Sequence, residues 1–254
     1  KGITAISWFF ISGIVGLALG DYFGFSGFAI LGPRVGSVFT TLAPAFTLVA
    51  GYFMVGERIN WIGIVGILIT LFSVAALSFS PSEILKVKSS GFGSLQKGIV
   101  FMILSSGCQG LGLVLANKGF EVAGSTAPDP IQATWIRMVA GTVIIFLVSL
   151  LSGRIVLMAK PILKNEGNGN WYALLGTFFG PVLGVLFSMV AVSLLHNQPS
   201  IAQTIFSLLP VFALPANRLI HKERITLKQV VIVLGACAGV LILIWRDFLL
   251  SAFS

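Results

Sequence analysis

The chain has 254 residues, of which 56% are hydrophobic and only 9% are charged. A soluble domain carries about 25% charged residues, so this composition excludes a soluble globular protein and indicates one that lies largely within a membrane. The formal net charge of +8 does not indicate a nucleic-acid partner. The basic residues fall between apolar runs, as they do in the cytoplasmic loops of membrane proteins.

Long runs without charged side chains mark the membrane spans. A helix needs about 20 mostly apolar residues to cross a bilayer. In chain order we expect helices over residues 3–30, 34–55, 60–80, 98–120, 131–152, 170–195, 199–220 and 226–246. The runs lack the alternating pattern of a transmembrane barrel. The sequence therefore predicts an all-α, polytopic membrane bundle of about eight transmembrane helices.

A polar stretch divides these helices into two groups. Residues 81–96 include Lys86, Lys88 and a Ser-Ser-Gly run, which is typical of a linker. We expect three helices before it, within residues 1–80, and five after it, within residues 97–247.

The second and seventh predicted helices form an internal repeat. Pro44 aligns with Pro210, and the Glu-Arg-Ile triplet at 57–59 aligns with the one at 223–225, both at a separation of 166 residues. The two copies are five spans apart, so they cross the membrane in opposite directions. Inverted repeats are common in secondary transporters, whose substrate site lies near the midplane between the halves. The repeat favours alternating access over a static scaffold.

Two other predicted helices carry glycines spaced by four residues. These ladders are Gly16, Gly20 and Gly24 in the first helix, and Gly176, Gly180 and Gly184 in the sixth. Glycine lets helix backbones approach closely, because no side chain intervenes. The ladders fit either simple close packing or helices that slide against their neighbours.

These motifs resemble those of the EamA-like family in the drug/metabolite transporter superfamily. The resemblance rests on Pro44 and the Gly-Glu-Arg ending at 56–58, on their later copy, and on Asn117-Lys118 followed by Arg137. It implies a ten-helix fold of two inverted five-helix halves. Residues 97–247 resemble a complete half, and residues 1–80 resemble the last three helices of the other, without its first two.

The resemblance also implies a function. Such a protein moves a small organic metabolite, for example an amino acid or a related compound, and export is favoured over import. Its expected partners are this small-molecule substrate and the lipid bilayer, with a homodimer as an open alternative. Its expected location is the cell membrane (plasma or inner membrane), which it crosses several times.

Two charged residues stand out within the predicted spans. Asp21 is the only acid there, and intramembrane acids often mark ion or proton paths. Asp21 is therefore the candidate for binding a coupling ion, unless the first helix ends near residue 22 and leaves it at the interface. Arg137 would attract an anionic substrate group if it lines a cavity. The alternatives are that it reaches the lipid headgroups or pairs with Asp129.

Several residues at helix ends and bends are structural or gating candidates. An acid and a base at each turn of the repeat form either a capping ion pair or a gate that changes partners between states. Lys118 fits an interfacial anchor. Prolines inside helices free carbonyl groups and bend helices, either around a cavity or only for packing. The members of this group are Pro44, Glu57, Arg58, Lys118, Pro210, Glu223 and Arg224.

Polar uncharged side chains within the spans are the main cavity candidates. Each needs a hydrogen-bonding partner inside the membrane, and a substrate is one source of such a partner. They are Ser12, Tyr22, Thr40, Thr41, Gln109, Asn117, Gln203, Thr204 and Ser207.

Two other classes of protein are alternatives to a transporter. An intramembrane enzyme is disfavoured, because His196 and His221 form no zinc motif, and no nucleophile elbow or P-loop occurs. We therefore expect no catalytic residue, metal or cofactor. A membrane subunit that does not itself transport is the other alternative.

The orientation of the chain in the membrane is ambiguous. Eight spans place both termini on one side, and most Lys and Arg residues fall on the opposite side. The positive-inside rule predicts that this opposite side is cytoplasmic, whereas the family resemblance implies cytoplasmic termini.

Overall fold

The computed structural model describes residues 2–78, 94–153, 156, 160, 169–195, 198–208, 211 and 227–253. The elements of this part are all helices. Five are long and apolar enough to cross a membrane: Thr4–Leu31, Val35–Met54, Leu95–Thr126, Pro130–Leu151 and Gly169–Leu194. Two shorter apolar helices, Trp61–Ala76 and Val230–Ile244, accompany them. The chain is thus an all-α, multi-pass membrane protein, as its composition predicts.

The first and sixth spans each contain a π-helical turn near the middle. The first span consists of α1 (Gly2–Gly13), η1 (Ile14–Leu19) and α2 (Gly20–Leu31). The sixth consists of α10 (Gly169–Thr177), η3 (Phe178–Val182) and α11 (Leu183–Leu194). Such turns are rare and occur often at functional sites. In both spans the turn interrupts the glycine ladder.

The second span is two helices rather than one. Helix α3 (Pro33–Thr40) ends at a two-residue turn, Thr41–Leu42, and α4 (Ala43–Met54) follows. The span lies where it was predicted, but the prediction that Pro44 sits inside a continuous helix is wrong, because the break comes before it. Pro44 is the second residue of α4, where its missing N–H costs nothing, because the first helical N–H groups have no partner within the helix.

The remaining helices lie close to their predicted positions. They are α5 (Trp61–Ser78), α7 (Leu95–Ala123) with a short η2 (Gly124–Thr126), α8 (Pro130–Leu151), α12 (Pro199–Phe206) and α14 (Leu227–Ile244). A last helix, α15 (Arg246–Phe253), was not predicted. Most of the linker at 81–96 and the second half of the helix expected at 199–220 lie outside the described residues.

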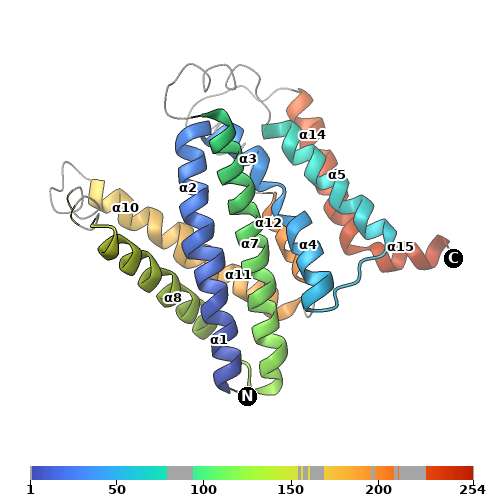
Figure 1. The fold of residues 1–254 in the computed structure, drawn as a ribbon. Coiled ribbons are helices and arrows are strands. Elements are labelled where there is room, and N and C mark those ends of the chain that lie inside the picture. Colours follow the sequence, from blue (N-terminus) through green and yellow to red (C-terminus); the bar gives the residue numbers. More distant parts are fainter. Residues whose placement is uncertain are drawn as a thin grey trace.

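The internal repeat reappears in the helix boundaries. Helix α12 begins 166 residues after α3 begins and ends 166 residues after α3 ends. The same separation relates α14 to α5. Helices α5 and α14 lie side by side and run in opposite directions (Figure 1). They meet at equivalent residues: the Thr70 hydroxyl, which donates to the Gly66 carbonyl oxygen at 2.9 Å, also lies 3.5 Å from the Ala236 carbonyl oxygen. An inverted repeat requires this antiparallel relation.

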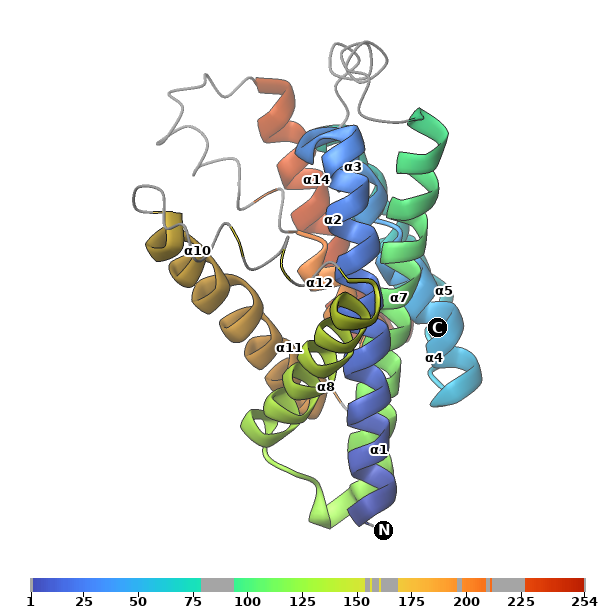
Figure 2. The same cartoon turned by 60° about the vertical axis from the view of Figure 1, so that its left-hand side comes forward.

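Helix α7 is the centre of the bundle. It packs against α1 and α2 along one side and against α4 on another, while α1 also packs against α8 (Figures 1 and 2). An apolar core fills the space between α1, α7, α8, α11 and α12. Its buried members are Phe9, Leu113, Ala116, Ala133, Met189, Val192 and Ala202. Met189 of this core contacts the guanidinium of Arg137, which is described below.

Candidate functional site

Four of the predicted cavity residues satisfy their hydroxyl groups within a helix or at the turn that ends it. Each donates to a carbonyl oxygen three or four residues earlier, over 2.6–2.8 Å. This bond is a common local solution for Ser and Thr in helices. The residues are Thr40, Thr41, Thr204 and Ser207. Each of these hydroxyl protons is already used in a local hydrogen bond and is not left free for a substrate.

Four others have different surroundings. Ser12 is buried and donates to the Gly112 carbonyl oxygen at 2.6 Å, which links α1 to α7. Tyr22 is 60% exposed and lies on the outer surface of α2. Gln109 on α7 and Gln203 on α12 are half-buried. The Gln109 side chain lies against Gly20 of α2.

Arg137 on α8 is buried deeply within the bundle. Its side chain is only 4% exposed, and its Nη1 donates to the Met189 sulfur at 3.2 Å, while its Nε has no hydrogen-bond partner. The alternatives that Arg137 reaches the headgroups or pairs with Asp129 are therefore wrong. Asp21, half-buried on α2, is electrostatically coupled to it.

The approach of α1 makes room for this arginine. A Cβ at Gly13 would overlap the Arg137 backbone, and a Cβ at Gly16 would lie 3.2 Å from Nη2 of Arg137. Only glycine permits helices to cross this closely. The first glycine ladder thus positions the guanidinium as well as the helices.

Asn117 on α7 is the second buried group without a partner. Its side chain is 2% exposed, and its Oδ1 accepts no hydrogen bond. Asn117 and Val192 line a cavity of about 360 Å³ between the end of α7, the start of α8 and α11. Val192 and Met189 are one turn apart on α11, and Met189 is the residue that contacts Arg137. Arg137 thus contacts α11 one turn away from this cavity but does not line it.

These two atoms are the candidate ligand-binding groups of the buried region. Arg137 Nε and Asn117 Oδ1 are the two fully buried side-chain atoms without a partner in the described part of the chain. An unsatisfied buried polar group costs about 1–3 kcal/mol. A ligand with an acceptor for the guanidinium and a donor for the amide would remove that cost.

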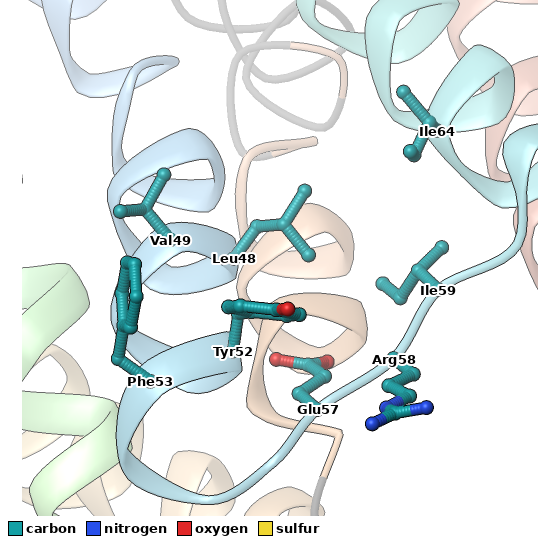
Figure 3. Close-up of a pocket in the computed structure, with 8 residues that line it drawn as sticks. All are labelled: Leu48, Val49, Tyr52, Phe53, Glu57, Arg58, Ile59 and Ile64. Carbon is teal, nitrogen blue, oxygen red and sulfur yellow. The ribbon is translucent and has the colours of Figure 1, made fainter.

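A second polar cluster joins the loop before α5 to the start of α12. Glu57 is 2% exposed, and its carboxylate accepts hydrogen bonds from the Ser200 hydroxyl at 2.6 Å and the Ser200 backbone N–H at 3.2 Å. Arg58 is exposed and points away (Figure 3). Of the two alternatives for this pair, a capping ion pair between Glu57 and Arg58 is therefore wrong, and Glu57 caps a different helix.

Arg246 completes this cluster and was missed by the sequence reasoning. Its guanidinium is buried and donates to the Gln198 side-chain oxygen and the Leu243 carbonyl oxygen, each at 3.1 Å. Gln198 precedes α12, so Arg246 and Glu57 hold the start of this helix from two sides. In the sequence, the only sign of this cluster was Pro199 at a predicted helix start. The sequence does not show that Glu57, 143 residues before Ser200, lies there.

Glu57 also borders a surface cavity. The cavity has a volume of about 580 Å³ and lies between α4, the following loop and α5 (Figure 3). Burial raises the pKa of Glu57 to about 7, although the hydrogen bonds from Ser200 and the charge of Arg246 act in the opposite direction. Glu57 is thus placed to change its charge near neutral pH.

The other gating candidates contribute less to either cluster. Lys118 forms an ion pair of 2.9 Å with Glu121 at the partly exposed end of α7. Pro44 is buried at the start of α4. Pro210, Glu223 and Arg224 lie outside the described residues.

Comparison with known proteins adds one finding. The model of the EamA-like transporter family matches residues 1–79 and 96–245 of the chain. No curated protein matches it.

Proposed function

Because the chain belongs to the EamA-like transporter family, we propose that it moves a small organic metabolite across the cell membrane by alternating access. The members of that family are transporters rather than enzymes, and this chain is an integral membrane protein of the drug/metabolite transporter type. The proposed substrate is an amino acid or a related compound, and the proposed direction is export.

The observation that carries this proposal is the pair of unpartnered atoms in the core. Arg137 Nε is a cationic donor, and Asn117 Oδ1 is an acceptor. A carboxylate on the substrate would satisfy the first, and an ammonium group would satisfy the second. Charge-assisted hydrogen bonds of this kind are among the strongest in proteins. The surrounding apolar core would enclose the rest of a small molecule.

The arrangement of the helices supports alternating access. Equivalent helices of the two halves run antiparallel, and a substrate site at their interface is typical of inverted-repeat transporters. The π-helical turns in the first and sixth spans supply places where these helices can adjust. The Arg137 site lies beside the first of these turns.

The test is an untargeted metabolite analysis of the medium from cells that express the protein or carry an empty vector. We expect one class of metabolite with an anionic group to accumulate outside. Arg137→Met keeps the length of the side chain but removes its charge. We expect it to lower the apparent affinity by roughly tenfold or more, because a hydrogen bond to a charged group contributes about 1.5–3 kcal/mol.

The matched control is Lys97→Met, which removes a basic side chain from the exposed start of α7. Both variants must reach the membrane in the same amount as the wild type. Export that survives Arg137→Met unchanged would contradict the proposed site. An unchanged medium with folded protein in the membrane would contradict export, and uptake of labelled metabolites would then be measured.

A further inference from the structure

The cavity beside Glu57 is a groove on the side of the bundle. Helix α4 packs against α7 and α12, and α5 packs against α14, so a space remains between α4 and α5 among the described elements. It has a volume of about 580 Å³. Three of the residues that line it, Val49, Tyr52 and Phe53, are 57–79% exposed. The groove is therefore open to the bilayer around the protein.

The side chains of the groove change from apolar to basic along its length. Val49 and Ile64 lie at one end and Arg58 lies at the other (Figure 3). Tyr52 lies between them, as tyrosine often does at the boundary between hydrocarbon and headgroups. The span that contains α4 ends at Met54, so Arg58 lies in the turn just beyond it. This order of side chains matches the order of groups in a phospholipid, from acyl chain to phosphate.

Arg58 has no protein partner in the described part of the chain. Its side chain is exposed and takes part in no ion pair or hydrogen bond there. The preceding acid, Glu57, is only 2% exposed and binds Ser200 on α12. Asp247, the acid that contacts Asn60 of the same loop, accepts a hydrogen bond from that residue at 3.2 Å. The Arg58 guanidinium is thus available to an anion at the surface of the membrane.

We propose that the groove between α4 and α5 binds one anionic glycerophospholipid, with its phosphate on the Arg58 guanidinium and an acyl chain between the two helices. Arginine can donate two parallel hydrogen bonds to a phosphate group. Basic pockets between transmembrane helices bind anionic headgroups, and the volume of the groove is typical of a ligand site. The site goes beyond the proposed function, because its ligand is a lipid of the bilayer rather than a transported substrate.

A phospholipid fits both ends of the groove, whereas other occupants fit one. A free phosphate would bind Arg58 but would leave Val49 and Phe53 uncovered. A helix from a second copy would cover these side chains, but it would also need an acidic residue for Arg58. Helices α4, α5, α8 and α14 expose apolar side chains and contain no acidic residue.

A bound lipid would also act on the contact between α4 and α12. Arg58 and Glu57 are neighbours in the turn that joins α4 to α5, and Glu57 caps the start of α12. A lipid that fixes Arg58 restrains this turn and so stabilises the position of Glu57 against Ser200. The lipid site therefore lies where it can strengthen the contact between the two halves of the protein.

The test is photolabelling of the protein in liposomes. The probe is phosphatidylglycerol with a diazirine in its acyl chain, added as a small fraction to phosphatidylcholine, and the reference probe carries the same chain on phosphatidylcholine. Mass spectrometry compares peptides from residues 48–64 with those from the exposed face of α8 around Phe146. We expect about fivefold more labelling of the groove by phosphatidylglycerol, because one basic residue attracts anionic lipid by about 1 kcal/mol. We expect no such excess on α8.

Two variants of Arg58 test the role of its charge. Arg58→Met should remove the phosphatidylglycerol excess, and Arg58→Lys should retain most of it. The Arg58 side chain is exposed and unpaired in the described structure, so both variants should fold as the wild type does. The matched control is Lys97→Met at the exposed start of α7, which should leave the excess at the groove unchanged.

A third variant tests the acyl-chain part of the site. Val49→Trp places a large side chain in the groove and should reduce labelling there by both lipids. Its control is Val139→Trp on α8, where the wild-type side chain is 52% exposed. This control should not change labelling of the groove.

Three outcomes would overturn the proposal. Equal labelling of the groove and of α8 by phosphatidylglycerol would indicate only the lipid that surrounds any membrane protein. An excess that survives Arg58→Met would show that Arg58 does not hold the phosphate. A groove that neither lipid labels would be covered by protein, such as a second copy. None of these measurements requires a transport substrate, so failure here is distinct from failure of the proposed function.

Discussion

The glycine ladders of the first and sixth spans share a spacing and a π-helical turn, yet their surroundings differ. A Cβ at Gly16 would lie 3.2 Å from the Gly112 Cα, and a Cβ at Gly24 would lie 2.9 Å from the Ser105 hydroxyl. At Gly176, Gly180 and Gly184 a Cβ would meet no described atom within 4 Å. The first ladder is packed against α7. The second faces open space in the described structure, on a helix that diverges from the centre (Figure 2).

This difference shows what a small-residue pattern does and does not reveal. The spacing makes close approach possible in both helices, but only α1, η1 and α2 meet a partner along it among the described helices. In the first ladder the close approach also holds Arg137 in place. The functional value of the pattern therefore depends on the neighbour rather than on the glycines.

The largest effect is expected where two glycines meet. A Cβ at Gly112 would lie 2.5 Å from the Gly16 Cα, which is backbone and cannot move aside without separating the helices. Gly112→Leu should destabilise the protein by about 1–3 kcal/mol or more, as overpacked cores do. Thermal unfolding of the purified protein measures this effect.

The control for that variant is Gly176→Leu in the open ladder. It should leave the unfolding midpoint close to that of the wild type. Equal destabilisation by the two variants would mean that the second ladder is also packed.

A smaller effect is expected from a single methyl group placed at equivalent points of the two ladders. In Gly24→Ala the methyl would crowd the Ser105 hydroxyl, which donates to the Gly20 carbonyl oxygen at 2.8 Å. Loss of that bond should cost about 1 kcal/mol. Gly184→Ala meets nothing, and alanine favours a helix by up to about 1 kcal/mol over glycine.

The two alanine variants should therefore move the unfolding midpoint in opposite directions. The quantity to compare is the difference between their two unfolding midpoints, because both variants are glycine-to-alanine changes in a membrane helix. The comparison fails if both variants shift the midpoint in the same direction.

The smallest effect is expected from a single hydrogen bond beside the packed ladder. Ser12→Ala removes the bond from α1 to the Gly112 carbonyl oxygen. Such bonds between membrane helices average about 0.6 kcal/mol, so a small loss of stability is expected. Thr177→Ala in the sixth span removes only a bond within its own helix and should cost less. A larger loss from Thr177→Ala would reverse the comparison.

Much of the fold was predictable because it depends on local properties. Apolar runs long enough to cross a bilayer located the spans, and α5 and α12 begin within one residue of their predicted positions. The break at Thr41–Leu42 was not predicted. Pro44 was expected to bend a continuous helix, whereas it lies at the start of a new one. Proline is compatible with a bend inside one helix and with the start of a new helix. Packing against α7 and α12 selects the new helix.

The candidate site was predictable only in part. Arg137 and Asn117 were predicted to be site residues because polar groups within a membrane need partners. In the structure both are buried, and each has one side-chain atom without a hydrogen-bond partner. Nine polar uncharged side chains were candidates on the same grounds, but Thr and Ser residues can satisfy themselves on their own helix. Whether they do so depends on their rotamers. Glu57 was placed at a helix end correctly, but the pairing considered for it was with its neighbour Arg58, whereas its carboxylate binds Ser200.

The sequence by itself determined that this protein lies in a membrane and that its spans are helices, and it predicts that two stretches repeat in opposite orientation. These properties follow from hydropathy, from span length and from the odd number of spans that separates the two copies. None of them requires knowledge of tertiary contacts. Only the tertiary structure decided which glycine ladder has a neighbour, which polar atoms lack partners and which helix Glu57 caps. Those outcomes depend on groups far apart in the chain, and their distances are set by how the helices pack.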